Sequence, residues 1–256
     1  MRLAWCLWTF GGRPGCGGAT LAEKAVLAPK ILAPESTIME STLDELQALV
    51  AVADAGSIAA TPFMLHAIAP LVPEFRRAWP RIELELDTDE LNIDLLERRT
   101  DVAIRIGALR DSSLHARPLC TSKIRVLASP AYIAAHGQPK NVAALAGHTL
   151  LGFTQPESLN RWPLRGGDAD GLVITPSLRA SSGETLRRLA LEGVGIVCLS
   201  DFMTAGDRAE GALVQVLARE TVDVRQPIQA VYYRNTQLAG RIRCFLDFLQ
   251  QRMSPK

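Results

Sequence analysis

The sequence has almost no excess of charge, few aromatic residues and no long hydrophobic run. Its 28 Lys and Arg nearly balance 27 Asp and Glu, so the net charge of +1 gives no electrostatic argument for nucleic-acid binding. Aromatic residues make up 5% of the chain and hydrophobic residues 48%, as in ordinary soluble globular proteins. The apolar runs fall far short of the roughly 20 residues that a membrane helix needs. The chain is long enough for one large core or two modest ones.

Residues with special chemistry are also scarce. The five cysteines are scattered without a C-x-x-C pair, so we expect neither a disulfide framework nor a zinc site, and a reducing cytoplasm fits best. The four histidines have no carboxylate or cysteine at metal-ligand spacing. The sequence contains no nucleophile elbow of a hydrolase and no dinucleotide-binding loop. We therefore expect no metal, no cofactor and no enzymatic activity.

The first 57 residues predict two short regions. In residues 1–38, the apolar stretch MRLAWCLWTF is followed by GGRPGCGGA and resembles a secretion signal only weakly. We expect a disordered or wrongly translated extension there, with Met39 as the natural start. Residues 39–57 predict an amphipathic helix, because Thr42 and Glu45 form a capping box and apolar residues recur at helical spacing until Gly56.

From residue 58 onward, strand patterns and helix patterns alternate, which favours parallel strands covered by helices. Strands are predicted at residues 58–61, 82–87, 101–107, 123–128, 149–153, 172–174, 196–199 and 228–233. Helices are predicted at residues 63–79, 91–99, 131–136, 141–145, 181–191 and 238–253. Pro70 and Pro73 should kink or delay the first of these helices. The economical architecture is α/β, with two lobes and a cleft between them.

Several stretches resemble the LysR-type transcriptional regulators. TLDELQALVAVADAGS resembles the opening of their winged helix-turn-helix, whereas HAIAPLVPEFRRAWPRIELEL, DVAIRIGALRDSSLHARPL and RVLASPAYIAAHGQP resemble parts of their effector domain. LRASSGETLRRLALEGVGIVCLSDF and YRNTQLAGRIRCFLDFL agree as well. The resemblance implies a two-lobed, periplasmic-binding-protein-like (type II) effector domain over residues 58–256, preceded by a remnant helix. Lobe I would hold about 58–128 and part of 205–256, and lobe II about 129–204.

The resemblance also implies that a part is missing. A helix-turn-helix needs a second helix and a recognition helix that lies in the major groove. After Gly56 and Ser57, however, the sequence passes directly into IAATPF, which resembles the first strand of the effector domain. Residues 39–60 contain several acidic residues and no Lys or Arg. Because operator recognition requires base contacts and positive charge near the phosphates, we expect sequence-specific DNA binding to be lost.

The effector cleft is expected to survive and to bind a small anionic molecule. Two groups of candidate residues open predicted helices, where free N–H groups attract anions. A serine at such a position can equally act only as a helix cap, as in the capping box of Ser181 and Glu184. The resemblance adds the end of the strand at 101–107 and the beginning of the strand at 196–199. The candidate effector-binding residues are Thr61, Phe63, Met64, Ile106, Gly107, Ser181, Ser182, Gly183, Gly195 and Ile196.

Three classes of function remain open. The first is a truncated regulator whose effector domain pairs with a second copy or with a full-length relative through its first lobe, as the resemblance implies. The second is a two-lobed solute-binding protein of a transport system, which would need export. The third is an enzyme, for which no catalytic constellation is present. The sequence favours the first, a cytoplasmic protein.

Overall fold

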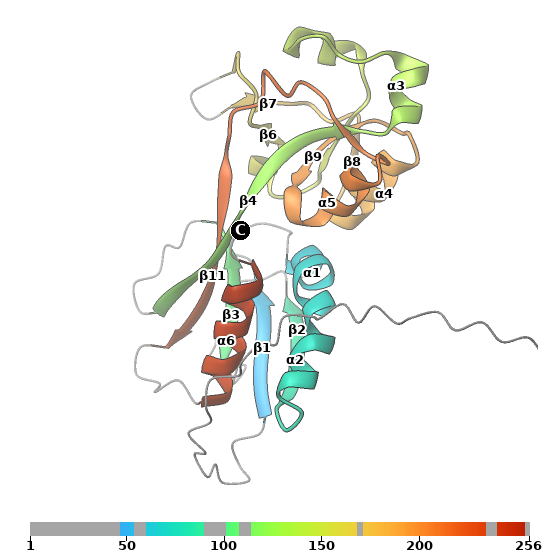
Figure 1. The fold of residues 1–256 in the computed structure, drawn as a ribbon. Coiled ribbons are helices and arrows are strands. Elements are labelled where there is room, and N and C mark those ends of the chain that lie inside the picture. The colour runs from blue at the N-terminus through green and yellow to red at the C-terminus, as the bar shows by residue number, and fades with distance from the viewer. Residues whose placement is uncertain are drawn as a thin grey trace, which may run out of the picture. The chain divides into compact units, whose positions relative to one another are not determined.

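The computed structural model describes residues 47–53, 60–89, 101–107, 114–167, 171–233 and 240–253 (Figure 1). These residues all belong to one compact unit within Ser41–Lys256. The expectations for residues 1–38 and for a helix at 91–99 lie outside the described residues.

Nine strands form one sheet of order β2-β1-β3-β11-β4-β9-β5-β8, in which β10 pairs with β4. The strand β4 (Leu114–Ala128) is long enough to serve both lobes, because its first part pairs with β11 (Arg225–Tyr233) and its last part with β9 (Ile196–Ser200). Figure 1 shows β4 and β11 running from one lobe toward the other. The two-lobed α/β architecture predicted from the sequence is therefore confirmed.

Lobe I contains one end of this sheet and the helices that cover it. Its further strands are β1 (Gln47–Ala53), β2 (Glu83–Asp89) and β3 (Val102–Ile106), and its helical segments are α1 (Ala60–Phe63), η2 (Met64–Ile68), η3 (Ala69–Leu71), α2 (Val72–Ala78) and α6 (Gly240–Met253). The core includes Phe75, whose ring meets that of Phe245 edge to face at 5.1 Å between centroids. The predicted apolar stripe of the C-terminal helix is buried, since Ile242, Leu246 and Leu249 belong to the same core.

Lobe II has a core on each face of its part of the sheet. Its remaining elements are α3 (Pro130–His136), η4 (Val142–Gly147), β5 (Leu150–Phe153), η5 (Glu157–Asn160), the hairpin pair β6 (Arg161–Trp162) and β7 (Leu172–Val173), β8 (Leu178–Ala180), α4 (Gly183–Leu191), α5 (Asp201–Ala209) and β10 (Val214–Gln215). Along β9, Ile196 and Cys198 face one core while Val197 and Leu199 face the other. This alternation is what a strand buried on both faces requires.

The structure corrects the helix expected at residues 39–57. Gln47–Ala53 is instead the strand β1, which lies between β2 and β3 and runs parallel to both. A short, continuous apolar run fits a buried parallel strand as well as a helix, and the ladder to two neighbouring strands decides between them. The remaining residues of that expected helix lie outside the described residues.

The strand expected at residues 58–61 is also wrong where it is described, because Ala60 and Thr61 begin α1. The helix that follows is broken, as Pro70 and Pro73 predict. It passes from α1 through one π-helical turn and one 3₁₀ turn into α2, and each proline lies near the start of the segment that follows the break.

The boundary of lobe II needs a correction as well. Lobe II extends beyond its expected end at about residue 204, because Met203 and Leu213 pack in one core of lobe II and Leu217 packs in the other. The chain returns to lobe I only along β11. The helix α5, which begins directly after β9, was not predicted.

Candidate effector cavity

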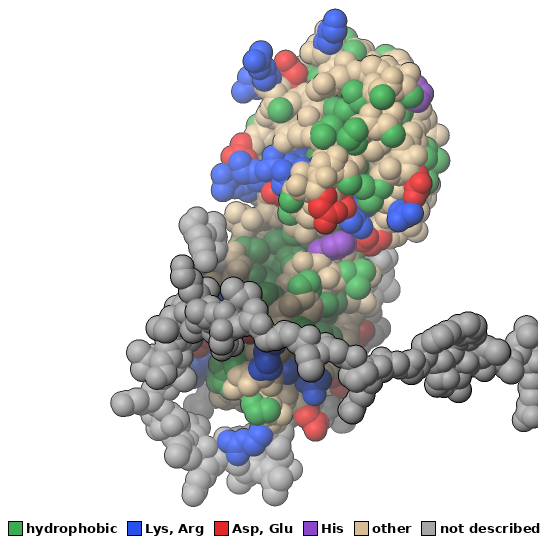
Figure 2. Space-filling model, turned by 45° about the vertical axis from the view of Figure 1, so that its right-hand side comes forward, with side chains coloured by type: hydrophobic (Ala, Val, Ile, Leu, Met, Phe, Trp, Pro, Cys, Tyr) green, Lys and Arg blue, Asp and Glu red, His purple; other side chains and the backbone are tan. Residues whose placement is uncertain are grey.

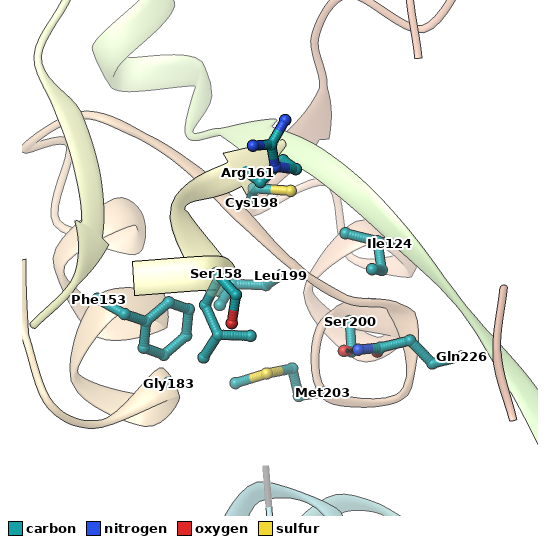
Figure 3. Close-up of a pocket in the computed structure, with 11 residues that line it drawn as sticks. Ile124, Phe153, Ser158, Arg161, Gly183, Cys198, Leu199, Ser200, Met203 and Gln226 are labelled. Atoms are coloured by element: carbon teal, nitrogen blue, oxygen red, sulfur yellow. Dashed lines mark hydrogen bonds between the residues drawn. The ribbon is translucent and has the colours of Figure 1, made fainter. Parts of the chain in front are cut away.

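A cavity of about 200 Å³ lies on the side of lobe II where β9 ends (Figure 3). This volume is more than ten times the roughly 10–15 Å³ that a single water needs, so the cavity can hold a small organic molecule. Seven of the lining residues are apolar, weakly polar or glycine and four are polar, a mixture that is typical of small-molecule sites. The lining residues are Ile124, Phe153, Ser158, Leu159, Arg161, Gly183, Cys198, Leu199, Ser200, Met203 and Gln226.

The wall comes from elements that are far apart in the sequence. Residues 198–200 end β9, and ligands in open α/β sheets bind at this carboxyl end of parallel strands. Ile124 and Gln226 come from the two strands that connect the lobes, whereas Ser158 and Leu159 come from the 3₁₀ turn η5. The cavity therefore touches the connecting strands and the body of lobe II at once.

Hydrogen-bonding groups lie toward one side of the cavity. The hydroxyl of Ser200 donates to Oε1 of Gln226 at 2.7 Å, which fixes the amide so that its N–H groups can serve as donors. Arg161 carries the only charge among those lining residues that the structure describes, and its Nη1 donates to the carbonyl of Gly171 at 3.4 Å. In Figure 3 its guanidinium points away from Phe153 and Met203. These groups can satisfy an oxygen-bearing or negatively charged ligand better than a cationic one.

The cysteine that lines the cavity, Cys198, is unreactive at neutral pH. Cys198 is 8% exposed, and burial raises the pKa of its thiol far above the ordinary value. Burial also raises the pKa of Cys120 to about 11. Because the thiolate is the nucleophile and the metal ligand, both side chains act as small apolar groups at neutral pH.

The helix α4 begins at the cavity without a side-chain cap. The structure corrects the expected capping box, because Ser182 rather than Ser181 is the N-cap residue and its side chain makes no capping hydrogen bond. The carboxylate of Glu184 instead forms hydrogen bonds with the side chains of His66 and Arg187. A Cβ on Gly183 would lie 3.3 Å from Cε of Met203, so a larger residue there would require the flexible Met203 side chain to shift by a few tenths of an ångström.

Of the ten residues expected to bind effector, the structure brings Gly183 alone to the cavity wall. Thr61 is half-buried in α1, Ser181 is exposed, and Ser182 occupies the N-cap position of α4 without a capping hydrogen bond. The others are structural: Phe63, Met64 and Ile106 lie in the core of lobe I, and Ile196 lies in that of lobe II. Contact of these residues with an effector stays a prediction.

Two of the predicted glycines have clear backbone roles. Gly107 has φ +101° at the end of β3, and its N–H donates to the carbonyl of Pro227 at 2.8 Å. A Cβ on Gly195 would lie 2.5 Å from the carbonyl oxygen of Thr149, so only glycine fits beside this strand.

Sequence reasoning missed most of the wall. Gln226, Ser158 and Arg161 lie in no recognisable motif, and only the fold brings them to the end of β9. The strand Ile196–Ser200 carried the one usable signal, because its carboxyl end was predictable as a ligand-facing edge. Within the part of the chain that the structure describes, no group of His, Cys, Asp and Glu could hold a metal ion. None of the helices described there is long and apolar enough to cross a membrane.

Comparison with known proteins identifies residues 56–254 as a LysR substrate binding domain. The transcriptional regulator CrgA of Neisseria meningitidis serogroup B is 48% identical over 194 residues, which cover 76% of this chain and 65% of CrgA. The regulator DmlR of Escherichia coli is 31% identical over 193 residues, which cover 74% of this chain and 62% of DmlR. The chain therefore spans less than two thirds of the length of these relatives.

Solved structures agree with the fold. The regulatory domain of CrgA matches with a TM-score of 0.73 at 46% identity, covering 81% of this chain and 99% of that domain. The full-length virulence activator AphB of Vibrio cholerae matches with a TM-score of 0.64 at 28% identity, covering 79% of this chain and 67% of AphB.

Proposed function

Because the chain belongs to the LysR family of transcriptional regulators, we propose that it acts in transcription regulation as a sensor whose cavity binds a small anionic effector. The observation that carries this proposal is the cavity itself. It has an apolar body, hydrogen-bond donors from Gln226, and, among the described residues that line it, an arginine but no carboxylate. A molecule with an apolar body and one carboxylate matches both the apolar lining and the hydrogen-bonding groups of the cavity. The family membership also favours a cytoplasmic regulator over an exported solute-binding protein.

Effector binding can be measured by thermal unfolding with small carboxylates, of which benzoate is the first probe. A ligand at 100 times its Kd stabilises the folded state by about 2.7 kcal/mol. For a domain of this size, that energy raises Tm by roughly 5–10 °C. We expect Ser158→Trp to abolish this rise, because the indole fills the cavity from its exposed rim.

The matched control is Ala134→Trp, which places the same side chain on an exposed position of α3 away from the cavity wall. It should retain the full rise in Tm. Equal shifts in both variants, or a larger shift with benzylamine than with benzoate, would show that the ligand binds elsewhere or is not anionic.

The proposal includes loss of sequence-specific DNA binding in this chain. The segment that resembles the opening of the helix-turn-helix supplies the strand β1, and residues 39–60 contain no Lys or Arg. In a fluorescence-anisotropy titration with a labelled operator of a full-length relative, we expect no complex near the 10⁻⁸ M range that is typical of specific binding. A saturable complex in that range, sensitive to the operator sequence, would contradict the proposal.

Self-association through lobe I is the remaining part of the proposal. The strand β2 lies at an edge of the sheet and exposes Glu83, Glu85 and Asp87, whereas the neighbouring helix α2 exposes Arg76 and Arg77. A two-fold arrangement could bring the acidic edge of one copy against the basic helix of the other. The same contact could form a mixed dimer with a full-length relative.

A further inference from the structure

The two lobes make a polar contact beside the cavity. Nε2 of His66 in η2 of lobe I lies 2.6 Å from Oε1 of Glu184 in α4 of lobe II. The side chains are 26% and 27% exposed, so water still reaches both of them. Figure 2 shows a histidine together with acidic side chains at the level where the lobes meet.

The carboxylate of this pair is anchored within lobe II. Oε2 of Glu184 accepts a hydrogen bond from Arg187 at 3.3 Å. Arg187 in turn donates to both oxygens of Asp207 at 2.6 Å, and the hydrogen bond with Asp207 raises the pKa of this arginine. Glu184 is thus held in place whether or not His66 is present, and His66 is the partner that connects it to lobe I.

An apolar contact accompanies the polar one. The rings of Phe63 in α1 and Phe202 in α5 meet edge to face at 5.1 Å between centroids. Cγ of Pro62 lies 3.7 Å from the position that a Cβ of Gly183 would occupy. The end of α1 in lobe I therefore packs against the starts of α4 and α5 in lobe II.

The cavity touches both this contact and the strands that connect the lobes. Ile124 and Gln226 line it from β4 and β11, while Gly183 and Met203 line it from α4 and α5. Gly183 directly precedes Glu184. A molecule in the cavity would therefore contact the first turn of α4, which also forms the contact between the lobes.

We propose that His66 and Glu184 form a latch that holds lobe I against the first turn of α4, and that the regulator changes state by making or breaking it. This inference rests on the proposed function, because the latch has a purpose only if the cavity takes an effector. A partly exposed pair of this kind shifts an equilibrium by up to about fivefold. That strength suits a latch, because a ligand can overcome it by binding one state better than the other.

Hydrogen–deuterium exchange of the chain without ligand tests the latch. In His66→Ala and in Glu184→Ala, we expect the amides of η2 and of the first turn of α4 to exchange up to about fivefold faster. The double variant should exchange no faster than either single variant, because both changes remove the same contact. Circular dichroism confirms that each variant is folded.

Glu192→Ala is the matched control. Glu192 lies in the same lobe directly after α4 and pairs with Arg188 of that helix at 2.5 Å, with both side chains well exposed. It should leave exchange in η2 unchanged. Unchanged exchange in η2 of Glu184→Ala, or additive effects in the double variant, would overturn the latch. Because no ligand is present, either result leaves the benzoate test of the proposed function unaffected.

Discussion

Ala51→Pro should unfold lobe I at a markedly lower temperature than the unsubstituted chain. Ala51 lies in β1, paired with Asp87 of β2 on one side and with Ala103 of β3 on the other. A proline in a central strand removes a ladder hydrogen bond whichever neighbour the residue faces. We expect a loss of about 3 kcal/mol or more, comparable to a proline inside a helix. For a domain of this size, that loss lowers Tm by roughly 6–12 °C.

The same variant distinguishes a strand from a helix at this segment. If β1 is a strand, amide protection in β2 and β3 falls with it, because both strands lose a neighbour. Unchanged protection in β2 and β3 would contradict the pairing of β1 with both strands. Lys140→Pro, at an exposed position outside helices and strands, controls for the mere presence of a new proline.

Asp207→Ala should cost nearly as much, by a different mechanism. Asp207 is 7% exposed and accepts two hydrogen bonds from Arg187 at 2.6 Å each. Removing one partner of a largely buried pair leaves the other charge without compensation, which costs 3–5 kcal/mol when both are buried. Because the side chain of Arg187 is 23% exposed, we expect about 3 kcal/mol, measured by urea denaturation.

Glu157→Ala provides the comparison on the surface of the same lobe. Glu157 pairs with Arg179 at 3.2 Å, but the two side chains are 58% and 39% exposed. Solvent screens such a pair, so its loss should cost less than about 1 kcal/mol. Equal costs for the two variants would mean that Asp207 does not stabilise lobe II through its ion pair.

The sequence predicted most elements that have a clear period. The alternating residues 82–87 became β2, and the stripe of Ile242, Phe245, Leu246 and Leu249 became the buried face of α6. The strand expected at 123–128 proved much longer, since β4 begins at Leu114. Pro118 hides this extension, because it lies where the register between β4 and β11 shifts by one residue.

The effector cavity was predictable only in part. The sequence pointed to helix starts and strand ends, which brought Gly183 to the wall and left the other candidates elsewhere. Gln226 and Ser158 reach the cavity because β11 and η5 lie beside the carboxyl end of β9 in the folded protein. No local sequence pattern predicts this arrangement.

By itself, the sequence determined the α/β class, the two lobes and the resemblance to the LysR family, because periodic burial and local motifs are written into consecutive residues. The tertiary structure alone decided that Gln47–Ala53 is a strand rather than a helix, and that His66 meets Glu184. Both results depend on partners far away in the chain: β2 and β3 offer a ladder on either side of β1, and α4 brings a carboxylate 118 positions from the imidazole. A short apolar run has no strong preference for helix or strand, so its pairing with neighbouring strands decides its conformation.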